Sequence, residues 1–153
     1  MSDKIKVYSR DHILNVLIKY GIPGKKVILL DEHYVYLSDS KSDSFFFNLS
    51  NQVVDTFKYW KEDARDCDKY SRVLQAVGMM SHALQWETKS DKPAGITLGV
   101  FNFTGSNGGH SVNCILTKDD GKEEFYLKFY EPQNGREIFM TDPEIRSTHM
   151  LLI

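Results

Sequence analysis

The first half of the chain carries apolar residues at the spacing of helices. One such stripe covers residues 13–18 and stops at Gly21-Ile22-Pro23-Gly24, and a second includes Val53, Phe57 and Trp60. A third begins near Asp66 and predicts a longer amphipathic helix. Its apolar positions are Tyr70, Val73, Leu74, Val77 and Leu84.

Shorter apolar runs predict strands. Val27 to Leu30 and Tyr34 to Leu37 are typical of two short strands, whereas the polar stretch from Ser38 to Ser44 predicts a loop. Beyond Gly95, alternating and aromatic segments broken by glycine predict an antiparallel sheet that continues to the C-terminal Met150-Leu151-Leu152-Ile153. Helices followed by a sheet indicate an α+β fold, and 153 residues fit a single domain over 1–153.

Charge narrows the classes of partner. The formal charge is -2, and neither sign forms a block of the kind that binds nucleic acid or a membrane surface. The N-terminus, Met1-Ser2-Asp3-Lys4-Ile5, lacks the apolar core of a secretory signal, and no apolar run has the length of a membrane span. We therefore expect a cytoplasmic protein with free thiols and without nucleic-acid or membrane partners. The sequence does not indicate the oligomeric state.

A predicted hairpin brings two polar residues together. Asp119-Asp120-Gly121-Lys122 contains the Asp-Gly pair favoured in two-residue type I′ turns, so facing residue numbers should sum to 241. This register sets His110 directly opposite Glu131 and places Cys114 in the middle of the core face. We expect that face to pack against the helix stripe that contains Cys67.

Cys67 stands at the start of the third predicted helix, where the helix dipole favours a thiolate. A neighbouring imidazole could accept the thiol proton, and a carboxylate could orient that imidazole. We therefore interpret Cys67 as a nucleophile, His110 as its base and Glu131 as the orienting residue. The candidates for lining the substrate site or donating to an oxyanion are Trp60, Gln52, Gln133 and Asn134.

Two segments resemble a known superfamily. Asp66-Cys67-Asp68-Lys69-Tyr70-Ser71 is similar to the start of the nucleophile helix in transglutaminase-like cysteine peptidases. Gly109-His110-Ser111-Val112-Asn113 and Tyr130-Glu131-Pro132-Gln133-Asn134-Gly135 resemble the His and Glu strands in the C-terminal domain of Marasmius-type agglutinins. The resemblance implies a papain-like domain in which N-terminal helices pack on a C-terminal antiparallel sheet. It also implies the catalytic order Cys67, His110, Glu131.

The resulting hypothesis is a thiol peptidase or amidase, of phage or bacterial origin, that acts through an acyl-thioester on a protein, peptide or peptidoglycan substrate. No cofactor is expected, and calcium enters only through the family resemblance, because the sequence shows no metal-ligand spacing. The alternatives are a transglutaminase-like acyl transferase and a catalytically inactive module that binds a protein. Cys67 could also be a small core residue, and His110 with Glu131 a structural ion pair.

Overall fold

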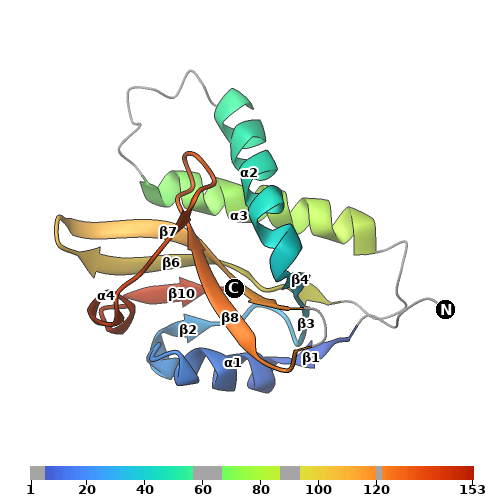
Figure 1. Cartoon of the computed structure of the whole chain (residues 1–153), viewed down its shortest axis with the longest axis horizontal. Helices are drawn as coiled ribbons and strands as arrows, with labels where there is room; N and C mark the ends of the chain where they lie inside the picture. The colour runs from blue at the N-terminus through green and yellow to red at the C-terminus, as the bar shows by residue number, and fades with distance from the viewer. Residues whose placement is uncertain (1–5, 57–66, 87–93, 120–121) are drawn as a thin grey trace.

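The computed structural model of the chain describes residues 6–56, 67–86, 94–119 and 122–153 (Figure 1). Its strands are β1 (Tyr8–Ser9), β2 (Val27–Ile28), β3 (His33–Val35), β4 (Leu37–Ser38), β5 (Gly95–Ile96), β6 (Leu98–Gly105), β7 (Gly108–Lys118), β8 (Phe125–Tyr130), β9 (Glu137–Ile138) and β10 (Met150–Leu152). Its helices are α1 (Arg10–Lys19), α2 (Asp39–Thr56), α3 (Cys67–Trp86) and α4 (Asp142–Arg146), with a 3-10 turn at Gly24–Lys26.

Two sheets organise this part of the chain. The larger runs in the order β2, β10, β6, β7, β8, β9, and β4 pairs with β7 outside that path. The three strands β6, β7 and β8 are antiparallel and form its centre, whereas β2 joins β10 and β4 joins β7 in parallel. The smaller sheet has the order β1, β3, β5. Strands from both halves of the sequence therefore share each sheet.

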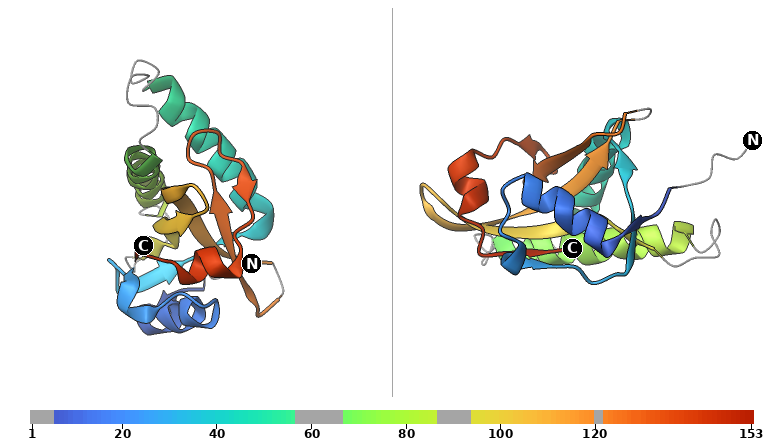
Figure 2. Two further views of the ribbon diagram at one scale, coloured as in Figure 1. Left: turned by 90° about the vertical axis from the view of Figure 1, so that its left-hand side faces the viewer. Right: turned by 90° about the horizontal axis from the view of Figure 1, so that it is seen from below.

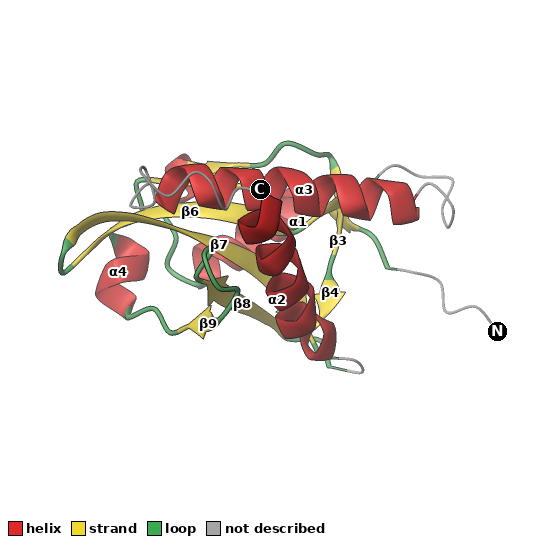
Figure 3. Ribbon diagram, turned by 90° about the horizontal axis from the view of Figure 1, so that it is seen from above, coloured by secondary structure: helices red, strands yellow, loops and turns green. Residues whose placement is uncertain are grey.

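Helices cover the two faces of the larger sheet (Figure 2). On one face, Ile13 and Leu17 of α1 are fully buried in a cluster with Val112 and Cys114 of β7. On the other face lie α2 and α3, whose core residues meet Ile115 of the same strand. Figure 3 shows α3 running along β6 and β7 while α2 crosses it. Because successive strand residues point to opposite faces, β7 supplies apolar side chains to both clusters.

Several elements follow the sequence-based expectations. The first helix spans Arg10–Lys19, and Ser9 caps it by accepting a hydrogen bond from the backbone N–H of His12. The third predicted helix begins at Cys67. Cys114 lies in the core as expected, and burial raises the pKa of its thiol to about 12. The second predicted stripe extends past the described residues, because Phe57 and Trp60 lie outside them.

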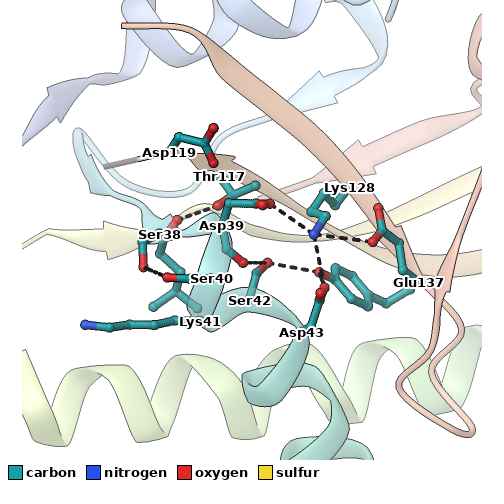
Figure 4. A network of polar contacts seen from close by, with 12 residues as sticks. Ser38, Asp39, Ser40, Lys41, Ser42, Asp43, Thr117, Asp119, Lys128 and Glu137 are labelled. Carbon is teal, nitrogen blue, oxygen red and sulfur yellow. Dashed lines mark hydrogen bonds and ion pairs between the residues drawn. The ribbon is translucent and has the colours of Figure 1, made fainter. Parts of the chain in front are cut away.

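The stretch from Ser38 to Ser44 is not a loop, as the sequence predicted, because α2 begins at Asp39. The helix start is held by ion pairs from Asp39 and Asp43 to Lys128 of β8, at 3.0 and 3.1 Å. Glu137 of β9 adds a third carboxylate at 3.3 Å, as Figure 4 shows. The helix start is therefore stabilised by a residue far away in the sequence.

Asp43 should make stability depend on acid pH. Burial raises the pKa of Asp43, but hydrogen bonds from Tyr130 and Lys128 and the Lys128 charge outweigh it, so the pKa is lowered. A lowered folded-state pKa stabilises the protein above the unfolded-state pKa, and this contribution is lost as pH falls through the folded value. Because the Asp43 side chain is 62% exposed, the contribution should be below about 1 kcal/mol. Urea unfolding between pH 6 and 3 checks this: Asp43→Asn should flatten the acid-side loss, and an unchanged pH profile would contradict it.

The predicted papain-like α+β fold, with N-terminal helices on a C-terminal antiparallel sheet, is wrong. The described chain is rich in sheet, and the N-terminal strands β2 and β4 belong to the larger sheet in parallel orientation. β1 and β3 build the smaller sheet with β5. Short strands were predicted at Val27 to Leu30 and Tyr34 to Leu37, where β2, β3 and β4 lie, but an apolar run does not show which strand it pairs with or in which direction.

Candidate functional site

A cleft of about 330 Å³ lies between the β6–β7 hairpin and α4. Gly105 and Gly108 face each other at the end of this hairpin, and Ser106 and Asn107 form its turn. Gly108 has a φ of +105°, which favours glycine at this position. The residues that line the cleft are Phe103, Gly105, Ser106, Asn107, Gly108, Gly109, His110 and Glu144.

His110 lines this cleft and forms a partly exposed polar pair with Glu131. Nε2 of His110 lies 3.4 Å from a carboxylate oxygen of Glu131, and their side chains are 37% and 23% exposed. The ring of Phe103 meets the imidazole edge-on, at 5.7 Å between centroids. The two residues that the sequence singled out as base and orienting group are therefore neighbours on the surface.

Their pairing arises from a different register than the predicted one. Cys114 faces Phe129 and Lys118 faces Phe125, so facing numbers sum to 243 and not to 241. The backbone N–H of Lys122 does donate to the carbonyl of Asp119, at 3.1 Å. The pairing of β7 with β8, however, begins only at Lys118 and Phe125, so Glu123 and Glu124 stay outside the ladder. A shift of two residues preserves the face of every side chain. Glu131 therefore reaches His110 diagonally across the strands.

Cys67 occupies the first turn of α3 and is partly exposed. One turn later, the Ser71 hydroxyl lies 2.8 Å from the Ser111 hydroxyl, and Asn113 donates to the Ser71 carbonyl at 2.9 Å. These bonds fix α3 to the face of β7 that carries Ser111 and Asn113.

His110 belongs to the opposite face of β7, because neighbouring strand residues alternate. The prediction that one sheet face carries His110 and packs against the Cys67 stripe is therefore wrong. In the described part of the chain, no hydrogen bond joins Cys67 to His110. The structure brings His110 and Glu131 together but does not connect Cys67 to them. The catalytic roles of the three residues stay a prediction.

The other predicted site residues do not line the cleft as the described residues define it. Gln52 is exposed on α2, and Gln133 and Asn134 are exposed in the turn between β8 and β9. The Asn134 side chain accepts a hydrogen bond from the backbone N–H of Arg136, which shapes that turn. Trp60 lies outside the described residues.

Glu144 is a residue of the cleft that sequence reasoning missed. One of its carboxylate oxygens accepts hydrogen bonds from the backbone N–H and the hydroxyl of Thr141, at 2.9 and 2.8 Å. These bonds complete a capping box on α4 and lower the pKa of Glu144. Its other oxygen faces Gly105 across the cleft. The sequence signal was Thr141-Asp142-Pro143-Glu144, a capping-box pattern.

Two classes of feature are missing from the residues that the structure describes. No group of three or more His, Cys, Asp or Glu side chains there could hold a metal ion. None of the helices there is both long enough and apolar enough to cross a membrane. The calcium requirement implied by the family resemblance is not tested by these findings.

Comparisons with known proteins identify the fold. The sequence matches no protein-family model and no curated protein. A solved structure described as a PSL1a-E64 complex has a TM-score of 0.66 and 17% identity, over 96% of this chain and 51% of its own. A structure of Polyporus squamosus lectin bound to the epitope Neu5Acα2-6Galβ1-4GlcNAc has a TM-score of 0.59 and 16% identity, over 96% and 49%. This chain thus has the fold found in about half of each matched chain.

These matches correct the assignment made from the sequence. The matched fold is that of a Polyporus squamosus lectin, so the assignment to papain-like cysteine peptidases is wrong. The prediction of a cysteine hydrolase is corrected with it, whereas the individual roles of Cys67, His110 and Glu131 stay a prediction. The structure also places α3 on the face of β7 opposite to the one that carries His110, which differs from the arrangement expected from the sequence. Short motifs around Cys67, His110 and Glu131 led to the wrong class.

Proposed function

We propose that this chain is a carbohydrate-binding domain and that its sugar site is the cleft beside His110 and Glu131. The observation that carries the proposal is the partly exposed His110–Glu131 pair at the wall of a glycine-lined cleft of about 330 Å³. A binding site for a small ligand is concave and has a few convergent polar groups, and this cleft meets both conditions.

The polar groups suit a ligand rich in hydroxyls. Each sugar hydroxyl both donates and accepts hydrogen bonds, so a complementary site needs acceptors and donors close together. Glu144 is an ionised acceptor that its capping box already holds in place. Asn107 and Ser106 offer groups that both donate and accept, and the His110 imidazole, which pairs with Glu131, lines the same cleft as Glu144.

The cleft can also admit the apolar face of a sugar ring. Glycine at positions 105, 108 and 109 leaves the backbone uncovered, and space beside Gly108 and Gly109 is open. Phe103 contributes an aromatic ring to the lining. The proposed ligand replaces the protein, peptide or peptidoglycan substrate expected from the sequence.

The fold comparison supports this class of ligand. The second matched structure holds a sialylated saccharide, and the fold shared with it covers nearly the whole of this chain. Because this chain spans about half of that lectin, the experiment must test the chain by itself.

Calorimetric titration with Neu5Acα2-6Galβ1-4GlcNAc, and separately with Galβ1-4GlcNAc, tests the proposal. We expect saturable binding with a Kd of about 0.1–1 mM, which corresponds to roughly 4–5.5 kcal/mol. His110→Ala and Glu131→Gln should each weaken binding at least about tenfold, since a hydrogen bond to a charged group is worth about 1.5–3 kcal/mol and about 1.4 kcal/mol is a factor of ten. His33→Ala is the matched control, because His33 is exposed on β3 and away from the cleft lining.

Three results would contradict the proposal. The wild-type chain could fail to bind either saccharide, which would leave sugar binding to the half of the lectin that this chain does not span. His33→Ala could weaken binding as much as His110→Ala. The chain could instead bind the E64 compound named in the other matched structure, and no saccharide, which would direct attention to Cys67.

A further inference from the structure

A larger groove, of about 610 Å³, lies along β8 and β9 and ends at α4. α4 separates it from the cleft described above, because Glu144 lines the cleft whereas Asp142 and Ile145 line the groove. The groove is lined by Tyr20, Asp39, Asp119, Tyr126, Leu127, Lys128, Phe129, Glu137, Ile138, Phe139, Met140, Asp142 and Ile145.

The lining offers apolar contact surface. Leu127, Ile138 and Met140 are partly buried residues at the edge of the core cluster below α1. Phe139 stands beside them and is 92% exposed. Because Phe139 continues the apolar lining formed by Leu127, Ile138 and Met140, one side of the groove is apolar, and another molecule can pack against it.

The charge of the groove is mainly negative. Its lining contains four carboxylates, on Asp39, Glu137, Asp142 and Asp119, the last of which pairs with Lys122, and one ammonium group, on Lys128. Its net charge of -3 is thus more negative than that of the whole chain, which is -2. Lys128 is already shared among Asp39, Asp43 and Glu137, at 3.0 to 3.3 Å (Figure 4). Because one ammonium group cannot neutralise three carboxylates, some of their oxygens remain available for a further cation.

The edge of β8 that faces the groove already has a hydrogen-bond partner in Tyr20. The Tyr20 hydroxyl donates to the carbonyl of Phe125, and it also contacts the backbone of Leu127. A partner strand could not form regular hydrogen bonds at these positions of β8. A ligand in the groove would therefore be held by its side chains, through ion pairs and apolar contacts.

From this combination we infer that the groove docks a basic peptide segment, in which Lys or Arg residues flank an aliphatic or aromatic residue. The basic side chains pair with Asp39, Glu137 and Asp142, and the apolar residue packs against Phe139. Charge complementarity selects this partner, because a nucleic acid or an anionic membrane surface would be repelled by the same carboxylates. The inference does not depend on the proposed sugar site.

Fluorescence anisotropy with a labelled peptide of about ten residues, containing four Lys or Arg around a central Leu, tests it. We expect saturable binding near 50 mM salt that weakens at least fivefold near 500 mM, because salt screens exposed charges. Glu137→Gln combined with Asp142→Asn should weaken binding roughly five- to twentyfold. Lys128 keeps Asp39 and Asp43 in this variant, and Thr141 still caps α4, so the fold should be preserved.

The control variant is Glu123→Gln combined with Glu124→Gln, which removes the same charge from a different cleft. It should bind the peptide like the wild type, whereas Phe139→Ser should weaken binding without removing any charge. Equal losses in the two double variants would overturn the inference, as would equal binding of a peptide with Glu in place of Lys and Arg. A dimer that Glu137→Gln with Asp142→Asn abolishes would assign the groove to a second copy of the chain, and would also overturn it.

Discussion

Replacing Gly135 by alanine is expected to lower the free energy of unfolding by about 3 kcal/mol, because two penalties add there. Gly135 has a φ of +66°, a backbone conformation that costs residues with a Cβ atom about 1–2 kcal/mol. An added Cβ would also lie 2.6 Å from the carbonyl oxygen of Phe46 and 2.8 Å from the Cα of Phe47. Both contacts are backbone atoms of α2, so no side-chain rotation can relieve them.

Gly21→Ala is the matched control for this change. Gly21 has a φ of +88°, but nothing lies within 4 Å of its added Cβ, so only the backbone penalty applies. Urea unfolding should give a loss of about 1–2 kcal/mol for Gly21→Ala and a clearly larger one for Gly135→Ala. Equal losses would show that α2 does not press on the turn between β8 and β9.

The second large effect is expected for Gln75→Leu, with a loss of about 2–4 kcal/mol in stability. Gln75 is 5% exposed on α3, and its amide donates to the carbonyls of Leu98 and Leu152, at 3.1 and 2.9 Å. Leucine has nearly the same volume but donates no hydrogen bond. Both carbonyls would then lose a partner in a place that water reaches poorly.

Thr97→Val provides the comparison, because it removes one buried hydrogen bond and keeps the shape of the side chain. The Thr97 hydroxyl donates to the Leu116 carbonyl at 2.7 Å, so this change should cost about 1 kcal/mol. Differential scanning calorimetry of both variants checks the ratio of their two losses in stability. A Gln75→Leu protein as stable as Thr97→Val would mean that the bridge from α3 to β6 and β10 contributes little.

Local sequence patterns predicted the elements whose stability is local. α1 carries its own cap and its own apolar stripe, and α3 begins where the third stripe begins. The start of α2 was missed for the opposite reason. Its polar residues form a helix because Asp39 and Asp43 pair with Lys128, which no local pattern could reveal.

The pairing of His110 with Glu131 was predicted because a two-residue error in register leaves each side chain on the same face of the sheet. His110 and Glu131 share a face whether facing numbers sum to 241 or to 243. The periodicity could not show which face α3 covers, since β7 is apolar on both faces. Cys67 was therefore placed with the wrong face. Fold comparison, not a motif, identified the fold.

The central claim is that the β6–β7 hairpin and α4 border a sugar site. Amide chemical shifts of the isotope-labelled chain, followed by NMR during titration with Neu5Acα2-6Galβ1-4GlcNAc, test it most directly. We predict saturable shifts confined to Gly105 through His110, to Glu131 and to Glu144, with little change along α3. An unperturbed spectrum, or shifts confined to another face of the molecule, would contradict the account.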